Sequence, residues 1–310
     1  MDNHACDLII IGAGPAGLTS AIYAKRAGLG VKVFECLSPG GQAAVTPEIE
    51  NYPAIKKISG ADFSISLFEQ AAQLGAEIEF EAVNGITSAG ENKVVVTDSG
   101  SYTSKAVIIA NGAKRRKLNI PGEEEFSGKG VSYCATCDGA FFKGKTVVVI
   151  GGGNTALEDA LYLANICEKV YLVHRRDEFR ASIHLVNQVL ETKNIEIFYS
   201  FEPQEISGSS AVESIKLINK KDGKVLDLKT CAVFVAVGLI PDNDKFSNII
   251  ELENGYIKAG EDCKTSAKGI FAAGDTRTKM LRQIVTAAAD GAVAANQAAE
   301  YISKARGISK

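Results

Sequence analysis

Short apolar runs punctuated by glycine mark the elements of this chain. The first lies in DLIIIGAGPAGLTSAIYAKRAGLGVKVFE, from Asp7 to Glu35. Its pattern predicts a strand at Leu8–Ile11, a glycine turn, a helix at Gly14–Ala27 and a strand at Val31–Phe34. The segment therefore reads as a βαβ unit, in which a helix connects two parallel strands.

The same unit returns in TVVVIGGGNTALEDALYLANICEKVYLVHRR, from Thr146 to Arg176. At a constant offset, the second copy repeats the key positions of the first: Gly12, Gly14, Gly17 and Glu35 become Gly151, Gly153, Ala156 and His174. Each copy continues into short strands with turn signals, at 86–109 and 215–237, which are typical of small antiparallel meanders.

The end of the chain lacks a second half of its own. It contains the strand Gly269–Ala273, the dipeptide Gly274-Asp275 and an alanine-rich helix from about Gln283 to Ala305. We expect this tail to return to the first domain. The predicted fold is α/β, with two Rossmann-like, three-layer ββα nucleotide-binding domains and the second inserted into the first. The expected boundaries are 1–112 with 242–310, and 115–239.

Composition excludes several classes of protein. The 310 residues are 46% hydrophobic and 23% charged, with a net charge of −3, so we expect a globular chain and no nucleic-acid partner. No run reaches the roughly 18 apolar residues of a membrane span. The seven cysteines are an odd number, and no signal peptide precedes the first strand, so we expect a reducing cytoplasm.

The glycine turns have the chemistry of dinucleotide sites. In GxGxxG, glycines permit the tight turn and let a pyrophosphate approach the helix N-terminus. One copy alone could need its glycines for packing only, but two copies in strand–turn–helix context favour binding. Glu35 would accept hydrogen bonds from ribose hydroxyls and repel a 2′-phosphate, so the first site suits FAD or NAD.

The second site ends in HRRDEFR, which carries Arg175, Arg176 and Arg180. Guanidinium groups bind phosphate bidentately, so this site suits the 2′-phosphate of NADPH. The alternative is a solvated basic turn, within which Asp177 and Glu178 pair or cap. The nearby GAFFKGKT fits the P-loop pattern, but it precedes a strand instead of following one, so we reject nucleotide hydrolysis.

The pair Cys134 and Cys137 lies just before the second glycine turn. No second close pair accompanies it, which disfavours zinc, so no metal is expected. The remaining interpretations are two incidental buried thiols or a redox dithiol. Asp138 is a candidate proton donor for dithiol exchange, or an ordinary turn aspartate. A dithiol that serves both a flavin and an external partner would require hinges at about 112–116 and 239–243.

Taken together, these motifs resemble the bacterial low-molecular-weight thioredoxin reductases over essentially the whole chain. The matching segments are GAGPAG, PGGQ, IENYP, CATCD, GGGNTA, HRRDEFRA and AAGD with LRQIVTAAADG. The resemblance implies an NADPH-dependent flavoprotein that reduces thioredoxin, with bound FAD, a homodimer, and a disulfide that alternates with a dithiol. It also implies that Cys137 faces the flavin and Cys134 attacks thioredoxin.

The resemblance assigns the cofactor contacts by position. Those expected at FAD are Gly12, Gly14, Pro15, Ala16, Gly17, Glu35, Cys36, Gly40, Gly41, Gln42, Asn51, Asp275, Arg282, Gln283 and Ile284. Those expected at NADPH are Gly151, Gly153, Asn154, Thr155, His174, Arg175, Arg176 and Arg180. Two positions depart from the family pattern: Asn111 replaces a threonine, and Ala289 replaces a glycine.

Three other functions compete with this interpretation. The flavoprotein of a peroxide-reducing system would carry an additional N-terminal dithiol domain, whereas the flavin unit here starts at Asp7. A ferredoxin-fed reductase of the same fold would lack the arginine cluster. A redox-sensing binding module would need neither the CATCD segment nor a complete NADPH site.

Overall fold

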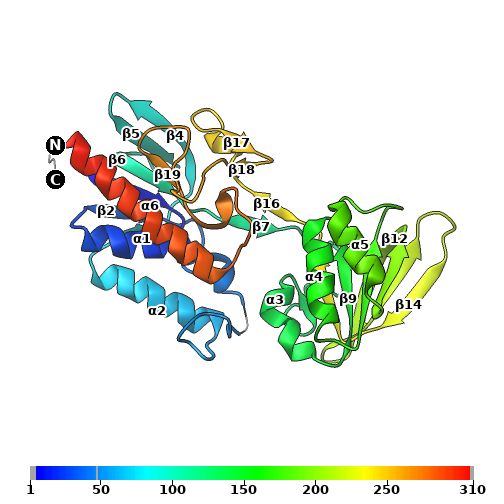
Figure 1. The fold of residues 1–310 in the computed structure, drawn as a ribbon. Helices are drawn as coiled ribbons and strands as arrows, with labels where there is room; N and C mark the ends of the chain where they lie inside the picture. Colours follow the sequence, from blue (N-terminus) through cyan, green and yellow to red (C-terminus); the bar gives the residue numbers. More distant parts are fainter. Residues whose placement is uncertain (1–4, 47, 308–310) are drawn as a thin grey trace. The chain divides into compact units, whose positions relative to one another are not determined.

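The computed structural model describes residues 5–46 and 48–307. The chain forms two compact units, 1–114 with 240–310 and 115–239 (Figure 1). It passes between them twice, through β7 (Ala113–Arg115) and β16 (Leu239–Pro241), which pair as a two-stranded sheet. The hinges expected in these segments stay a prediction.

The first unit is built on a seven-stranded sheet with the order β3-β2-β1-β6-β5-β4, in which β19 also pairs with β6. Strands β3, β2, β1, β6 and β19 are parallel, and β4, β5 and β6 form an antiparallel meander. The bounds are β1 Ala5–Ile11, β2 Val31–Phe34, β3 Glu77–Glu79, β4 Val83–Ala89, β5 Asn92–Thr97, β6 Ser101–Ile109 and β19 Ile270–Ala272.

Both faces of this sheet are covered, which explains why its central strands are continuous apolar runs. In β1, Leu8 and Ile10 belong to the core that the helices cover, whereas Ile9 and Ile11 belong to the core under the meander. The second core also contains residues of the returning segment, among them η3 (Asp244–Phe246) and the short pair β17 (Leu252–Glu253) and β18 (Tyr256–Ile257).

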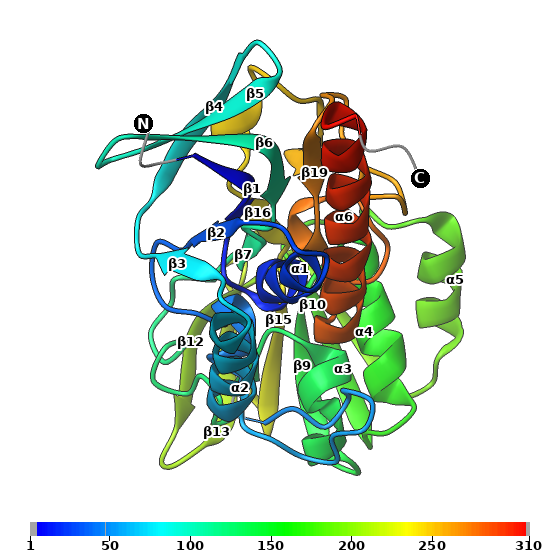
Figure 2. The same cartoon turned by 90° about the vertical axis from the view of Figure 1, so that its left-hand side faces the viewer.

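The helices of this unit are α1 (Pro15–Arg26), α2 (Gly60–Gln73) and α6 (Ile284–Ala305). Helix α6 runs beside α1 (Figure 2), and small residues allow the two backbones to approach closely. A Cβ atom added at Gly291 of α6 would lie 2.3 Å from the Ala16 carbonyl oxygen of α1. The first unit also contains the one-turn helices η1 (Gly41–Ala43) and η4 (Gly274–Thr276).

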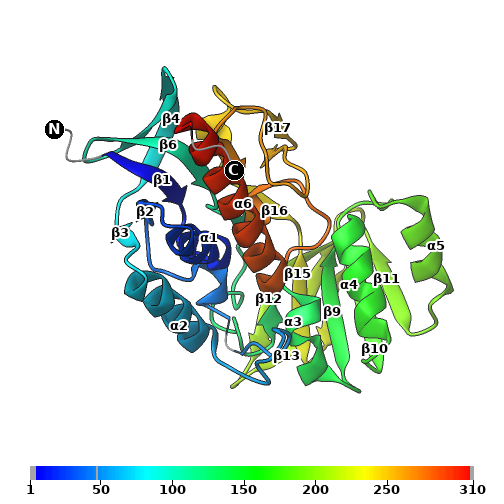
Figure 3. The same cartoon turned by 60° about the vertical axis from the view of Figure 1, so that its left-hand side comes forward.

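The second unit repeats this plan. Its parallel sheet has the order β11-β10-β9-β15-β8, with α4 and α5 on one face (Figure 3) and the antiparallel β12-β13-β14 sheet on the other. The bounds are β8 Val131–Ser132, α3 Ala135–Asp138, η2 Gly139–Phe142, β9 Thr146–Gly151, α4 Asn154–Ala164, β10 Lys169–His174, α5 Ile183–Glu191, β11 Ile195–Tyr199, β12 Phe201–Gly208, β13 Val212–Asn219, β14 Val225–Lys229 and β15 Ala232–Ala236.

The observed elements confirm the predicted fold class, two α/β units with parallel Rossmann-like sheets. The GAFFKGKT segment forms η2 and leads into β9 without opening a helix behind a strand, so it lacks the context of a P-loop. Within the described ranges, no helix is long and apolar enough to cross a membrane.

Candidate active site and cofactor sites

The first glycine turn connects β1 to α1 in a conformation that requires glycine. Gly12 has a φ of +103°, and a Cβ there would lie 2.5 Å from the Ala110 carbonyl oxygen. A Cβ at Gly17 would lie 1.8 Å from the Gly12 carbonyl oxygen. Gly14 is the N-cap of α1 and has no capping side chain, so the first N–H groups of the helix face outward for an anion.

Glu35 follows β2 and lies at this turn, as its position in the motif predicts. One carboxylate oxygen accepts a hydrogen bond from the Ala13 N–H at 2.8 Å, and the other accepts one from the Leu37 N–H at 3.0 Å. The neighbouring Cys36 is exposed, and desolvation together with the Glu35 charge raises the pKa of its thiol. Cys36 therefore remains a protonated thiol rather than a nucleophile.

Segments distant in sequence bring further predicted FAD contacts together. Gly41 lies opposite Gly14, where a Cβ on Gly41 would be 3.4 Å from the Gly14 Cα. The Asn51 side-chain amide donates to the Gln283 side chain at 3.0 Å. Gln283 is also the N-cap of α6, where it forms a capping box with Thr286, so its backbone is fixed at the helix start.

Arg282 and Asp275 lie on the segment that leads into α6. The Arg282 guanidinium stacks over the Tyr256 ring, with its central carbon 4.3 Å from the ring centroid. Its Nε atom is buried and has no hydrogen-bond partner among the described residues, which leaves a donor for a ligand. Asp275 lies in η4, next to Gly274.

The two departures from the family pattern have different outcomes. The Asn111 side chain donates to the Asp242 carbonyl at 3.0 Å and accepts from the Thr276 hydroxyl at 2.8 Å. It therefore joins the end of β6 to the returning segment and to the residue after Asp275. Ala289 is exposed on α6, and no contact in the structure explains its identity.

A cavity of about 510 Å³ opens at the second glycine turn. It is lined by all eight residues predicted for NADPH, which are Gly151, Gly153, Asn154, Thr155, His174, Arg175, Arg176 and Arg180. Three residues outside this prediction line the same cavity from the segment after β7, namely Arg116, Lys117 and Leu118. No local motif marks that segment, because only the fold brings it to the glycine turn.

Backbone hydrogen bonds join the segment that carries the arginines to the second glycine turn. The Asn154 side chain accepts from the Ser182 N–H at 2.9 Å, and the Arg180 N–H donates to the Gly152 carbonyl at 2.7 Å. Asp177 forms an ion pair with Lys221 and a hydrogen bond with Ser200.

His174 lies behind the arginines. Its Nε2 atom contacts the Glu178 carbonyl at 3.0 Å, and a Cβ at Gly152 would meet its ring at 2.1 Å. Burial, with the nearby arginines, lowers the pKa of His174. The imidazole is therefore neutral at pH 7 and supports the turn rather than adding charge to it.

Cys134 and Cys137 form a disulfide, with their Cα atoms 5.3 Å apart. Cys134 is the N-cap of α3, and its Sγ accepts a hydrogen bond from the Cys137 N–H at 3.2 Å. A donor in this position stabilises negative charge on sulfur once the disulfide is reduced. The described residues contain no cluster of three or more metal-ligating side chains.

Asp138 ends α3, one residue after the disulfide. Its carboxylate accepts a hydrogen bond from the Ser132 hydroxyl at 2.6 Å, and the same hydroxyl accepts from the Cys134 N–H at 3.1 Å. Burial raises the pKa of Asp138 against the opposing effects of Ser132 and Arg115. A raised pKa and a hydroxyl partner are the properties expected of a group that exchanges protons.

The chain is similar to known proteins in both sequence and fold. The family model of the pyridine nucleotide-disulphide oxidoreductases matches residues 6–291. A thioredoxin reductase of Bacillus subtilis is 43% identical over 298 residues, covering 96% of this chain and 94% of its own. The thioredoxin reductase of Treponema pallidum is 42% identical, with 96% and 97% covered.

Solved structures agree with the sequence comparison. The crystal structure of a thioredoxin reductase from Streptococcus pyogenes superposes with a TM-score of 0.93 at 40% identity. The superposition covers 98% of this chain and all of the other.

Proposed function

The chain belongs to the pyridine nucleotide-disulphide oxidoreductases and, within them, to the low-molecular-weight thioredoxin reductases, and we propose that it carries electrons from NADPH through FAD to thioredoxin. One observation carries the proposal. The Cys134–Cys137 disulfide, Asp138 and the arginine-lined cavity lie in the same unit of the chain. An acceptor of electrons and a site for their nucleotide source thus share one folded body.

The residues of the second unit fit NADPH. The α4 N-terminus is capped by Gly153 without a side-chain bond, so its N–H groups can hold a pyrophosphate. Arg175, Arg176 and Arg180 line the same cavity and would hold the 2′-phosphate.

The residues of the first unit fit FAD. Gly14 leaves the N-terminus of α1 open, Glu35 lies where an adenosine ribose would bind, and Arg282 Nε has no partner in the part of the chain that the structure describes. When bound, FAD supplies the two-electron relay between the nicotinamide and the disulfide.

The chemistry of the cysteine pair follows from the balance of electrons and protons. Two electrons and two protons convert the disulfide to the dithiol. The Cys134 thiolate then attacks the thioredoxin disulfide, and a mixed disulfide forms as one thioredoxin sulfur leaves. Cys137 then attacks the Cys134 sulfur and displaces the second thioredoxin sulfur, which releases reduced thioredoxin and restores the Cys134–Cys137 disulfide. Asp138 gives and accepts the proton that these sulfur atoms exchange.

Two further parts of the proposal rest on the family. We propose a homodimer, as the resemblance to this family implies. We also place the enzyme in a reducing cytoplasm, which the free thiols of Cys6, Cys36, Cys167, Cys231 and Cys263 favour.

A single substitution tests the proposed route. Cys134→Ser should abolish NADPH-dependent reduction of thioredoxin and leave the bleaching of bound flavin by NADPH intact. Cys231→Ser, which removes an exposed thiol of the same unit, is the matched control and should retain full activity. Thioredoxin turnover that survives Cys134→Ser would reject the dithiol assignment.

A further inference from the structure

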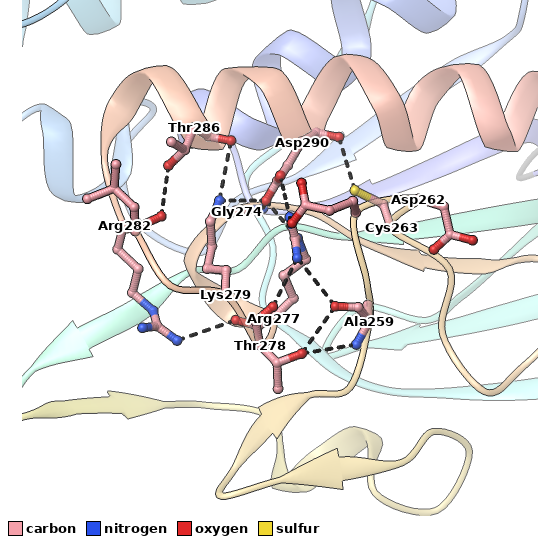
Figure 4. Close-up of polar contacts among 12 residues, drawn as sticks. Ala259, Asp262, Cys263, Gly274, Arg277, Thr278, Lys279, Arg282, Thr286 and Asp290 are labelled. Carbon is pink, nitrogen blue, oxygen red and sulfur yellow. Dashed lines mark hydrogen bonds and ion pairs between the residues drawn. The ribbon is translucent and has the colours of Figure 1, made fainter. Parts of the chain in front are cut away.

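A buried ionic cluster holds the segment that leads into α6, and nothing in the motifs assigns it a role. Figure 4 shows the Asp290 carboxylate of α6 facing Arg277 and Lys279. One carboxylate oxygen accepts from Arg277 Nη2 at 2.7 Å. The other accepts from Arg277 Nε at 2.9 Å, from Lys279 Nζ at 2.7 Å and from the Gly274 N–H at 2.9 Å.

The cluster is withdrawn from water. The side chain of Arg277 is 2% exposed, that of Lys279 is 5% exposed and that of Asp290 is 8% exposed. A buried carboxylate without partners would take up a proton, but the bonds from Arg277 and Lys279 outweigh burial and hold the pKa of Asp290 below its ordinary value. Asp290 is therefore charged at neutral pH, and its acceptor positions are filled by donors from one short segment.

The bonds from this carboxylate reach the residues expected at FAD. The Gly274 N–H immediately precedes Asp275, and Arg277 supplies the carbonyl that Arg282 Nη2 contacts at 3.4 Å. Arg277 Nη1 also donates to the Thr278 carbonyl at 2.9 Å and to the Ala259 carbonyl at 3.3 Å (Figure 4). The guanidinium therefore holds the backbone at both of these residues.

Gly274, which donates to this carboxylate, and Gly291, which follows Asp290, both pack against the start of α1 at the first glycine turn. Gly274 has a φ of +80°, and a Cβ there would lie 2.8 Å from the Ala16 Cβ of α1. Gly291, next to Asp290, packs against the Ala16 backbone. Helix α6, η4 and the start of α1 thus meet around Asp290, so its bond to Gly274 sets where Asp275 lies relative to the turn that would hold the pyrophosphate.

We propose that Asp290 is a positioning residue for the flavin half of the cofactor site, acting through Gly274, Arg277 and Lys279 on Asp275 and Arg282. The proposal rests on the proposed FAD site. Under this proposal, different residues hold the two halves of FAD. The glycine turn and Glu35 would bind the adenosine half, whereas binding of the flavin half would depend on the Asp290 cluster.

The test uses the full chain freed of flavin and titrated with FAD and, separately, with ADP as a probe of the adenosine half. Asp290→Asn removes the charge at nearly constant size. It should weaken FAD binding by on the order of 10- to 100-fold, the factor expected for loss of a charge-assisted hydrogen bond, and leave ADP binding unchanged. The visible absorption band of the flavin that still binds should also change.

Asp262→Asn is the matched control, because Asp262 lies on the same unit, next to Cys263 in Figure 4, and its exposed side chain pairs only with exposed Lys264 among the described ion pairs. It should bind FAD like the unmodified protein. Lys279→Met leaves the Arg277–Asp290 pair in place and serves as the second variant if Asp290→Asn does not fold; it should weaken FAD binding less and spare ADP binding.

Unchanged FAD binding in these variants would overturn the positioning role. A parallel loss of FAD and ADP binding would overturn it as well, since the carboxylate would then merely maintain the fold. Failure of the unmodified protein to bind FAD would instead reject the proposed function itself.

Discussion

The arginine cluster gives the sharpest quantitative prediction, because NADPH and NADH differ only in the phosphate that the arginines would bind. Arg175 and Arg176 line the cavity beside the second glycine turn. The nearest acid in sequence, Asp177, is taken by Lys221 and Ser200. Replacing both arginines by alanine should therefore remove phosphate contacts without releasing an internal ion pair.

The magnitude follows from exposure. A hydrogen bond to a charged group contributes roughly 1.5–3 kcal/mol, and the lower value applies here because both arginines are exposed to water and salt. Two such losses amount to about 3 kcal/mol, which corresponds to a roughly 150-fold lower kcat/KM for NADPH. The kcat/KM for NADH should change little, because NADH offers no 2′-phosphate.

The assay compares the initial rates of thioredoxin reduction with the two nucleotides at fixed ionic strength. A variant with Lys224→Ala and Lys229→Ala is the matched control, because it removes two exposed positive charges from the same unit outside the cavity. Its preference for NADPH should equal that of the unmodified enzyme. An equal loss with NADPH and NADH in the Arg175 and Arg176 variant would refute the phosphate role.

Three further predictions concern the acid and the first glycine turn. Asp138→Asn should lower thioredoxin turnover by on the order of 10²- to 10⁴-fold and leave flavin bleaching by NADPH intact, as stopped-flow absorbance would show. Burial raises the pKa of Asp138, and thioredoxin turnover should fall as pH rises through this raised pKa, because the acid loses its proton. Ser132→Ala removes a hydrogen bond that stabilises the ionised carboxylate, so the fall in turnover should move to higher pH in a pH–rate profile. Gly17→Ala places a Cβ 1.8 Å from the Gly12 carbonyl oxygen, so thermal unfolding should show destabilisation of at least about 1–3 kcal/mol and FAD binding should be lost.

Much of the fold could be predicted because local sequence determines it. The βαβ units depend on adjacent apolar runs and glycines, and the predicted strand Val31–Phe34 has the observed bounds. The helix expected to start at about Gln283 begins at Ile284, with Gln283 as its cap. Turn residues at 98–100 and 221–223 similarly indicated the meanders, since short antiparallel strands pair with their neighbours in sequence.

The parts that could not be predicted depend on contacts between distant residues. Asp290 reads as one more polar position on a helix, and only the fold brings it to Gly274, Arg277 and Lys279. Glu123 is a second case. It is 1% exposed, and it accepts from the Leu118 N–H at the nucleotide cavity and from the Tyr133 hydroxyl beside Cys134. Asp290 does lie in the LRQIVTAAADG segment, but neither that segment nor the sequence around Glu123 shows which donors the carboxylate meets.

Glu35 and Asp290 differ from Asp138 in the type of hydrogen-bond partner that surrounds the carboxylate. Both accept from backbone N–H groups, and Asp290 also accepts from cationic side chains. None of these donors can accept a hydrogen bond in return, so a proton on the carboxyl would displace them. Asp138 instead faces the Ser132 hydroxyl, which donates to the carboxylate and can accept from the carboxylic acid. Asp138 can therefore change protonation state without losing its partner, and the type of partner, more than burial, suits it to proton transfer at the disulfide.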